Sequence, residues 1–227
     1  MSVKYFDPEE IKKAIRILKP DNELFEARLI AGTMVRSGYF NDAETLLSQL
    51  REQNLANTSV YISLQRLHRG CEARLQYERF LETGKLKLPT TSDHDITAYE
   101  WLPIDLDPVR PAGISSTKAE MTEAYALRVQ IAAYMEAQGY KQHITACSGN
   151  GYHLLYRIDW EKTPETVDRV QGILNRLDEL FSNDAVKVDI TNYNPSRIFK
   201  LYGTLAQKGR STTDRPHRIS KLLEVIA

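Results

Sequence analysis

Apolar residues recur at the spacing of a helix or of a strand over most of this chain. The first helical stripe follows Asp7, a preferred capping residue, and Pro8, which suits a first helical turn, and it must end before Pro20. Its apolar positions are Ile11, Ala14, Ile15 and Leu18. A second helix is expected after a cap at Asn41 or Asp42, with apolar positions Ala43, Leu46, Leu47 and Leu50. A short strand over 60–63 and a third helix over 72–81 follow, and a polar break at 90–93 ends this part.

The chain beyond residue 95 predicts the order strand, helix, strand, strand, helix, strand. The first strand ends at Asp105, and a long helix over 118–138 stops at Gly139. Strands over 144–146 and 153–158 are joined by a glycine-rich turn, and a helix opened by Pro164 leads to a strand over 186–189. This order indicates a split β-α-β sheet with helices packed on it. We therefore predict an α+β fold, with an N-terminal α/β module over 1–91 and a second module over 92–227.

Composition is that of an ordinary globular protein, with 42% hydrophobic and 26% charged residues among 227. No apolar run approaches the roughly 20 residues of a membrane span, and no signal peptide begins the sequence, so a cytoplasmic protein without a membrane partner is expected. Cys71 and Cys147 lack the spacing of a zinc site or a disulfide framework. The 30 basic and 30 acidic residues balance, which argues against simple coating of nucleic acid but permits local basic patches.

Asp105 and Asp107 are the most informative pair of polar residues. They flank Leu106 at the end of an apolar run, so on a strand both carboxylates share one face. Neighbouring acids repel each other unless a positive charge lies between them, and the usual one is Mg²⁺ or Mn²⁺. The same pattern occurs in glycosyltransferases and nucleases, and with Pro108 it also suits a plain surface turn.

The turn from Ser148 to His153 is the second candidate. Gly149 and Gly151 let the backbone approach a ligand and expose amide groups, which suits a phosphate. The Ser148 hydroxyl and the His153 imidazole are further donors to phosphate oxygens. The alternative is an ordinary hairpin turn, since Gly-Asn-Gly is good turn chemistry.

A third acid and a basic stretch follow these motifs. Asp189 ends the last predicted strand, and beside Asp105 and Asp107 it would complete a site for two metal ions. The stretch 197–218 contains one acid, Asp214, and six basic residues, which are Arg197, Lys200, Lys208, Arg210, Arg215 and Arg218. Basic side chains beside a metal site suit a triphosphate or a nucleic acid backbone, although a solvated basic tail is the commoner fate of such charge.

In this order, the motifs resemble those of the archaeo-eukaryotic primase superfamily, above all its bacterial, plasmid, phage and CRISPR-associated primase-polymerases. The resemblance covers residues 90–218 and extends weakly upstream through Ser37-Gly-Tyr-Phe40 and Val60-Tyr-Ile-Ser63. The motifs that carry it are Asp105-Leu-Asp-Pro-Val-Arg-Pro-Ala-Gly-Ile-Ser-Ser-Thr, Ser148-Gly-Asn-Gly-Tyr-His153, Val188-Asp189, Arg197-Ile-Phe-Lys200-Leu-Tyr-Gly-Thr204 and Lys208-Gly209.

The resemblance implies a role for each matching position and an RRM-like sheet preceded by an α/β module. Asp105, Asp107 and Asp189 are implied to be catalytic and to bind two divalent ions, Mg²⁺ or Mn²⁺. The implied nucleotide-binding residues are Ser148, Gly149, Gly151, His153, Arg197 and Lys200. We assign contacts with nucleic acid to Arg110, Lys208, Arg215 and Arg218.

The function expected on this basis is a DNA primase or DNA polymerase. It would transfer a nucleotide from an NTP or dNTP to a 3′-hydroxyl on a single-stranded or primed DNA template. A metal-dependent nuclease with the same acids and a non-catalytic replication-initiator module are the alternatives. The zinc-binding insertion and the helical or helicase domain of many family members have no counterpart in this sequence. A separate accessory domain, or a replication or CRISPR-associated protein, is therefore a candidate partner.

Overall fold

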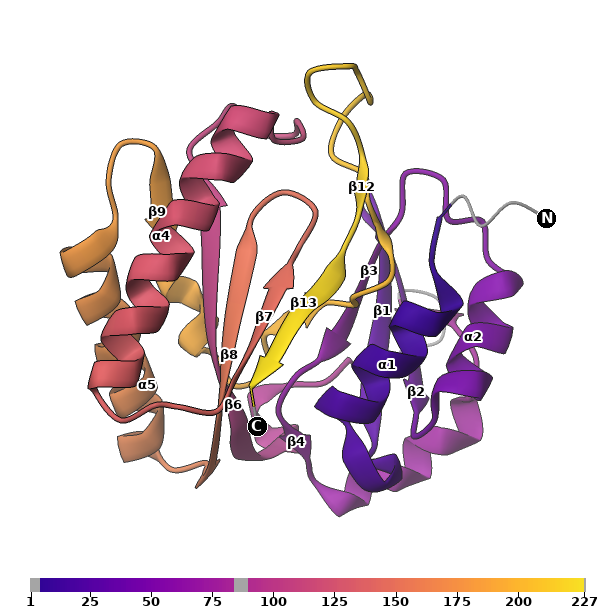
Figure 1. Ribbon diagram of the computed structural model, residues 1–227. Coiled ribbons are helices and arrows are strands. Elements are labelled where there is room, and N and C mark those ends of the chain that lie inside the picture. Colours follow the sequence, from indigo (N-terminus) through magenta and orange to yellow (C-terminus); the bar gives the residue numbers. More distant parts are fainter. Residues whose placement is uncertain (1–4, 84–89, 227) are drawn as a thin grey trace.

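Two β-sheets lie side by side in the computed structural model, which describes residues 5–83 and 90–226 (Figure 1). The first sheet has the strand order β10-β3-β1-β2-β5. Its strands are β1 (Phe25–Ala31), β2 (Met34–Phe40), β3 (Ser59–Ser63), β5 (Leu81–Glu82) and β10 (Ile198–Lys200). Helices α1 (Pro8–Leu18) and α2 (Ala43–Arg51) accompany this sheet, and short 3₁₀ turns cover Pro20–Asn22 and Asp93–Asp95.

The two helices predicted for this part are confirmed, together with their caps. The side chain of Asp7 accepts hydrogen bonds from the amides of Glu9 and Glu10, and that of Asp42 accepts one from Thr45. The predicted third helix is wrong in type, because a 3₁₀ segment, Arg69–Tyr77, occupies most of its range. There Arg74 donates hydrogen bonds to Tyr39 and Asp95, each at 2.8 Å, so the segment is held by its neighbours rather than by an apolar helical face.

The second sheet contains the predicted split β-α-β order. Its elements are β6 (Ile96–Pro108), α4 (Lys118–Ala137), β7 (His143–Cys147), β8 (Tyr152–Glu161), α5 (Pro164–Phe181) and β9 (Val186–Val188). Strand β6 pairs with both β8 and β9, and β8 pairs with β7, all antiparallel. The order β9-β6-β8-β7 is that of a split β-α-β sheet. The predicted α+β class is therefore confirmed.

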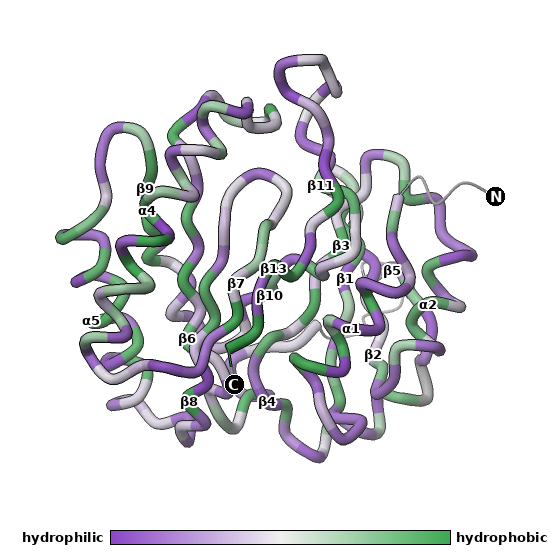
Figure 2. The backbone as a smooth tube through the Cα atoms, viewed as in Figure 1, coloured by the Kyte–Doolittle hydropathy of each residue, from purple (hydrophilic) through white to green (hydrophobic). Residues whose placement is uncertain are grey.

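Each sheet also takes a strand from the other part of the chain. Strand β4 (Arg66–Leu67) pairs with the start of β6, and β10 pairs with β3. After β10, the chain forms β11 (Leu205–Ala206), β12 (Arg218–Ile219) and β13 (Lys221–Ile226), which pairs with β7 at the sheet edge. The loop between β11 and β12 projects from the molecule and is mostly hydrophilic (Figure 2). The boundary at residue 91 stays a prediction, since both sheets mix residues from either side of it.

Alternation along β6 directs its side chains to two different cores. Leu102, Ile104 and Leu106 are buried against α4 and α5. Trp101 faces the other way and belongs to the core shared with α1 and the first sheet. Asp105 and Asp107 share the Trp101 side of the strand, so both acids point toward the space between the two sheets. Among the described residues, no helix is long and apolar enough to cross a membrane.

Candidate active site

A pocket of about 240 Å³ opens where the end of β6 meets the first sheet. Asp105 lies opposite His153 on β8, and its backbone carbonyl accepts a hydrogen bond of 2.9 Å from the Asp189 amide at the end of β9. The fold thus brings the three predicted acids and the predicted histidine to one place. The pocket is lined by Tyr61, Asp105, Asp107, Ser148, Asn150, His153, Asp189, Asn192, Arg197, Ile198, Phe199, Lys200, Ala206, Gln207 and Lys208.

Asp105 is the more buried of the paired acids, with 22% of its side chain exposed. Its Oδ1 atom is buried without a hydrogen-bond partner in the described part of the chain, and it lies 3.4 Å from Nε2 of His153. Burial raises the pKa of Asp105, but the His153 imidazole, Lys208 and Arg197 outweigh burial, and the net pKa is lowered. The carboxylate is therefore kept charged next to an unused acceptor atom.

Asp107 behaves in the opposite way. Burial and the charge of Asp105 raise its pKa, against the smaller effects of Lys208 and Arg110, whose Nη1 lies 3.6 Å from the carboxylate. Two carboxylates whose pKa values are driven apart are typical of a site in which like charges are held close together. A cation between them would remove this repulsion.

His153 is fixed rather than free. It is 3% exposed, its Nδ1 lies 2.7 Å from the Tyr202 hydroxyl, and its ring packs edge-on against Phe199. Tyr202 is fully buried, so it sets the orientation of the ring and leaves Nε2 toward Asp105 and the pocket. Tyr202 therefore acts through the histidine and belongs to the core.

The glycine-rich turn packs tightly against β6, which carries the acids, and against β11 and β12. Gly149 has φ 95°, and a Cβ atom on it would lie 2.5 Å from the Cβ of Ala206. The amide of Asn150 donates to the Ser148 hydroxyl at 3.3 Å, and the Asn150 side chain accepts a hydrogen bond of 2.9 Å from the Ser116 amide. The turn is thereby held by the segment after β6, and Ser148 reaches the pocket.

Gly151 allows a close contact that any side chain would prevent. A Cβ atom there would lie 2.3 Å from the carbonyl oxygen of Leu106 and 3.0 Å from Oδ1 of Asp107. We expect Gly151→Ala to push the end of β6 aside, to destabilise the fold by about 1–3 kcal/mol, and to weaken any cation binding at Asp107. Urea denaturation and Mn²⁺ titration measure the two effects. The control is Gly172→Ala on α5, where a Cβ meets nothing within 4 Å and helix propensity favours alanine by about 1 kcal/mol. Equal behaviour of the two variants would contradict the expectation.

Asp189 lies in the same pocket but its carboxylate is already engaged. Oδ1 accepts hydrogen bonds from the amide and the hydroxyl of Thr191, at 2.9 and 2.7 Å, and Oδ2 lies 3.6 Å from Nη2 of Arg197. Within residues 5–83 and 90–226, no three histidine, cysteine or acidic side chains form a group that could hold a metal. The donors therefore fit a cation at Asp105 and Asp107, where the unpartnered Oδ1 lies. Asp189 fits as a third ligand only if it turns away from Arg197.

The arrangement of strands and helices is shared with solved structures. The chain aligns with primase RepB′ at 14% identity and a TM-score of 0.52, over 96% of this chain and 56% of that one. The primase-polymerase AEP domain of cyanophage S-2L aligns at 14% identity and a TM-score of 0.53, over 97% and 91%. The polymerase domain of Mycobacterium tuberculosis ligase D, in complex with DNA, aligns at 12% identity and a TM-score of 0.52, over 92% and 78%. The chain has the fold of the archaeo-eukaryotic primases.

This likeness lies in the fold, because no family model and no curated protein sequence matches the chain. The chain spans 56% of the RepB′ structure but 91% of the cyanophage domain, so the primase fold is covered while RepB′ is longer. The fold implied by the sequence motifs is thus confirmed. The roles assigned to the individual residues rest on their own geometry.

Within the primase fold, three of the predicted basic residues line the pocket. Lys200 is buried, its Nζ donates a hydrogen bond of 3.1 Å to the Leu205 carbonyl, and burial together with Lys208 lowers its pKa to about 7. Arg197 is half exposed beside Asp189, and Lys208 is exposed. A buried lysine bonded to a carbonyl oxygen rather than to a carboxylate suits an anionic ligand as its partner.

The other three predicted basic residues do not line this pocket and bond within the chain. Arg110 donates to the carbonyl oxygens of Ile114 and Pro108, at 3.1 and 2.9 Å, and only 6% of its side chain is exposed. Arg215 pairs with Glu120, and Arg218 donates to the Ser116 carbonyl at 2.8 Å. Their guanidinium groups thus hold loops of the primase fold together, and their contact with nucleic acid stays a prediction.

Several pocket residues were not predicted from the sequence. Asn192 is 3% exposed and its Nδ2 has no hydrogen-bond partner among the described residues, and Gln207 and Tyr61 complete the wall. A spacing of three residues from Asp189 was the one available signal for Asn192. Tyr61 comes from β3, which pairs with β10 at Lys200, and this pairing across the sequence has no local signature.

Proposed function

We propose that the chain is a metal-dependent nucleotidyltransferase that extends a nucleic acid strand on a DNA template. The observation that carries the proposal is one pocket in which two paired carboxylates face three basic side chains. The acids are Asp105 and Asp107, and the basic residues are Arg197, Lys200 and Lys208. Such a division suits a metal ion at one end and the phosphates of a nucleoside triphosphate at the other.

Asp105 and Asp107 would hold a divalent ion, Mg²⁺ or Mn²⁺, with Asp189 as an added ligand for a second ion. When bound, such ions lower the pKa of an attacking hydroxyl and neutralise a departing pyrophosphate. The buried and unpartnered Oδ1 of Asp105 supports this assignment, as does the raised pKa of Asp107 beside it. A triphosphate would also give Arg197 a new partner, which would free Asp189 from its 3.6 Å contact with that guanidinium group.

The chain's own residues would bind and orient the nucleotide. Nε2 of His153 and the Ser148 hydroxyl would donate to phosphate oxygens, and the Lys200 ammonium group would pair with the phosphates in place of its present carbonyl contact. Positioning and neutralisation of charge supply most of the acceleration in phosphoryl transfer, so no side chain is needed as a covalent nucleophile. Cys147 supports this view, since burial raises the pKa of its thiol.

The partners proposed are an NTP or dNTP and a single-stranded or primed DNA template. The ligase D polymerase domain was solved with DNA, and this chain shares its fold. Lys208 lies at the mouth of the pocket on the projecting loop, where it would meet the nucleic acid backbone or the phosphates of the nucleotide. An accessory domain or replication partner is also proposed, because many members of the family that the sequence motifs resemble have an accessory domain.

The test is incubation of the purified chain with single-stranded DNA, labelled nucleotides and Mn²⁺, with and without a primer. We expect labelled product that grows with time and requires the metal. Growth without a primer would identify a primase, and growth only with a primer would identify a polymerase. Shortening of labelled DNA would favour the nuclease, and DNA binding without turnover would favour the non-catalytic module. Ribo- and deoxyribonucleotides are compared in parallel reactions.

A further inference from the structure

The loop between β11 and β12, residues 207–217, carries Lys208 to the pocket of the paired acids. Lys208 lines that pocket and also an adjoining cavity of about 190 Å³ that it shares with Asp107 and Arg110. Its charge lowers the pKa of Asp105 and of Lys200, among other causes, so it influences both ends of the site. Lys208 is exposed and its side chain is flexible, hence its placement depends on how firmly its backbone is held.

One side of the loop is attached to the first part of the chain through Gln207. Its Nε2 donates to the carbonyl oxygens of Leu55 and Thr58, at 2.9 and 3.1 Å, and its Oε1 accepts from the Asn57 amide at 3.1 Å. All the hydrogen-bonding atoms of this amide group are thus used. The residue before Lys208 is fixed by a segment about 150 positions away in the sequence.

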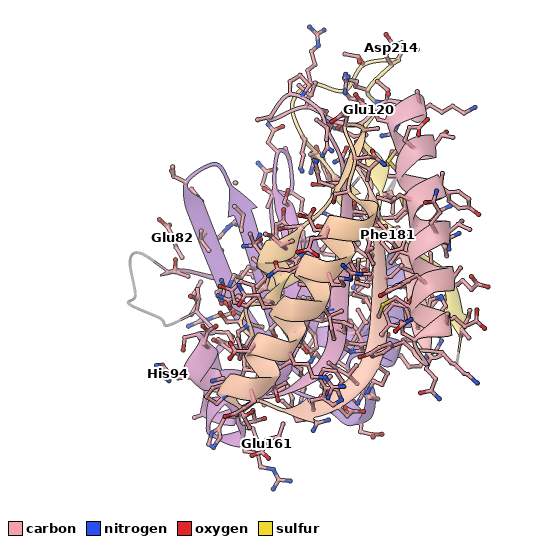
Figure 3. The ribbon with its side chains drawn as sticks, turned by 90° about the vertical axis from the view of Figure 1, so that its left-hand side faces the viewer. Glu82, His94, Glu120, Glu161, Phe181 and Asp214 are labelled. Atoms are coloured by element: carbon pink, nitrogen blue, oxygen red, sulfur yellow. The ribbon has the colours of Figure 1, made fainter. Side chains whose placement is uncertain are left out.

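The other side is attached to the start of α4 through Arg215. Its Nη1 and Nη2 donate to the two carboxylate oxygens of Glu120 at 2.9 and 2.8 Å, and Nη1 also donates to the Ser115 carbonyl at 2.8 Å. Ser115 in turn donates its hydroxyl to the carbonyl oxygen of Lys208 at 3.1 Å. The contacts therefore run from Glu120 through Arg215 and Ser115 to the backbone of Lys208. Figure 3 shows Glu120 at the same end of the molecule as Asp214, the neighbour of Arg215.

Glu120 is itself held in place before it meets Arg215. It is the third residue of α4, and its carboxylate accepts a hydrogen bond of 2.8 Å from the Thr117 amide while the Thr117 hydroxyl accepts from the Glu120 amide. A two-bond contact between a guanidinium group and a carboxylate fixes direction as well as distance. Only 27% of the Arg215 side chain is exposed, and its bonded groups point into the protein.

We propose that the Glu120–Arg215 pair positions Lys208, and that Arg215 acts through this pair rather than by touching nucleic acid. The role of Lys208 in the pocket rests on the proposed function, whereas the positioning of its backbone does not. Gln207 and the Glu120–Arg215 pair are the two attachments of the loop, and we call them together the clasp. Lys208 lies between them and lines the pocket. Loss of either charge of the pair frees one end of the clasp.

The experiment measures mobility and nucleotide binding separately. A nitroxide probe on Lys208→Cys reports the mobility of the loop without any ligand, since Cys71 and Cys147 are buried. We expect Glu120→Gln to raise the mobility and Arg215→Gln to raise it at least as much, because the arginine also donates to the Ser115 carbonyl. The double variant should match Arg215→Gln, and the exchanged pair Glu120→Arg with Arg215→Glu should recover much of the order. Arg210→Gln is the control, because Arg210 lies on the same loop without a hydrogen bond or ion pair to any described residue.

The same variants with Lys208 intact are compared for nucleotide KM and for DNA affinity at several salt concentrations. A positioning role predicts that Glu120→Gln and Arg215→Gln each raise the nucleotide KM about 10-fold, the size expected for a charge-assisted hydrogen bond. Lys208→Gln should raise the nucleotide KM by the same factor, and adding Glu120→Gln to Lys208→Gln should cause no further rise. A direct contact with DNA predicts instead that Arg215→Gln reduces the salt slope by about one while Glu120→Gln does not weaken binding.

Unchanged probe mobility in both single variants would overturn the proposal, as would a salt slope reduced by Arg215→Gln alone. If the wild-type chain binds no nucleoside triphosphate, the proposed function fails, and the mobility measurement still decides whether the clasp exists. Failure of the two ideas is therefore distinguishable.

Discussion

Asparagine in place of Asp105, of Asp107 or of both is expected to reduce nucleotide incorporation about 1,000-fold or more. The two carboxylates share one face at the end of β6, and Asp105 has a buried acceptor atom without a partner among the described residues. An amide has nearly the same shape but no charge, so it would not hold a divalent ion. Charge stabilisation by a bound ion is worth several kcal/mol, and about 1.4 kcal/mol corresponds to a factor of ten in rate. Primer extension with Mg²⁺ or Mn²⁺ measures the loss.

The fold is expected to survive these replacements. The charge of Asp105 raises the pKa of Asp107, which means that the two carboxylates repel each other in the metal-free protein. Removing the charge of Asp107 relieves this repulsion, so the melting temperature of Asp107→Asn is expected to stay the same or to rise. Asp105→Asn loses the favourable charges of His153, Lys208 and Arg197 and is expected to melt at a slightly lower temperature. Asp168→Asn is the matched control, because Asp168 is exposed on α5 and does not line the pocket. Near-normal primer extension by the double variant would contradict a metal site at these acids.

The elements that the sequence predicted well are those with strong local signals. The helix α5 begins at Pro164 as predicted, since proline marks its start and apolar residues keep helical spacing. Strand β6 was predicted from its apolar run and from the acids that end it. The common face of Asp105 and Asp107 followed from alternation alone, because successive side chains on a strand point to opposite sides.

The elements that were missed depend on contacts between distant residues. The hairpin of β1 and β2 was not predicted, although Phe25, Ala27 and Leu29 alternate with polar residues and are buried on one face. Strand β10 has three residues and is a strand because it pairs with β3, far earlier in the sequence. A pattern search along one segment has no access to such a pairing.

The same limit applies to the site. Asp105, His153 and Asp189 were predicted together because a resemblance of ordered motifs connected them. The roles of Arg215 and Arg218 were harder to predict, since a basic residue looks the same in the sequence whether it meets a phosphate or a carbonyl oxygen. Their partners, Glu120 and Ser116, lie about 100 positions away. Tyr202 likewise shows its contact with His153 only in the folded chain.

A second large effect is expected on stability, from Lys19→Met. Lys19 follows α1, and its Nζ lies 3.0 Å from Oε2 of Glu100 in the middle of β6, with both side chains fully buried. Nζ also donates to the Gln65 carbonyl at 3.1 Å. Breaking a buried ion pair from one side leaves an uncompensated charge and costs about 3–5 kcal/mol. Arg66, 2.8 Å from the other oxygen of Glu100, remains as a partner, so a loss near the lower end, about 3 kcal/mol, is expected from urea denaturation.

Lys12→Met on α1 is the control, since it breaks an exposed ion pair of 2.7 Å with Glu44 and is expected to cost far less stability than loss of the buried pair. Adding Glu100→Gln to Lys19→Met removes the stranded charge and is expected to restore much of the lost stability. Equal losses for Lys19→Met and Lys12→Met would show that burial of the first pair does not matter.

The pH dependence of this loss gives an independent check on the Lys19–Glu100 pair. Burial raises the pKa of Glu100, but Lys19 and the other partners outweigh burial and lower it. A lowered pKa stabilises the fold above the ordinary glutamate range, near 4.3, and this contribution is lost as the pH falls through the lowered value. The gap between wild type and Lys19→Met should therefore be fully open at pH 7 and should narrow below about pH 4. Glu100 lies five positions before Asp105 on the same strand, so the pair tested in this way joins the end of α1 to the strand that carries the acids.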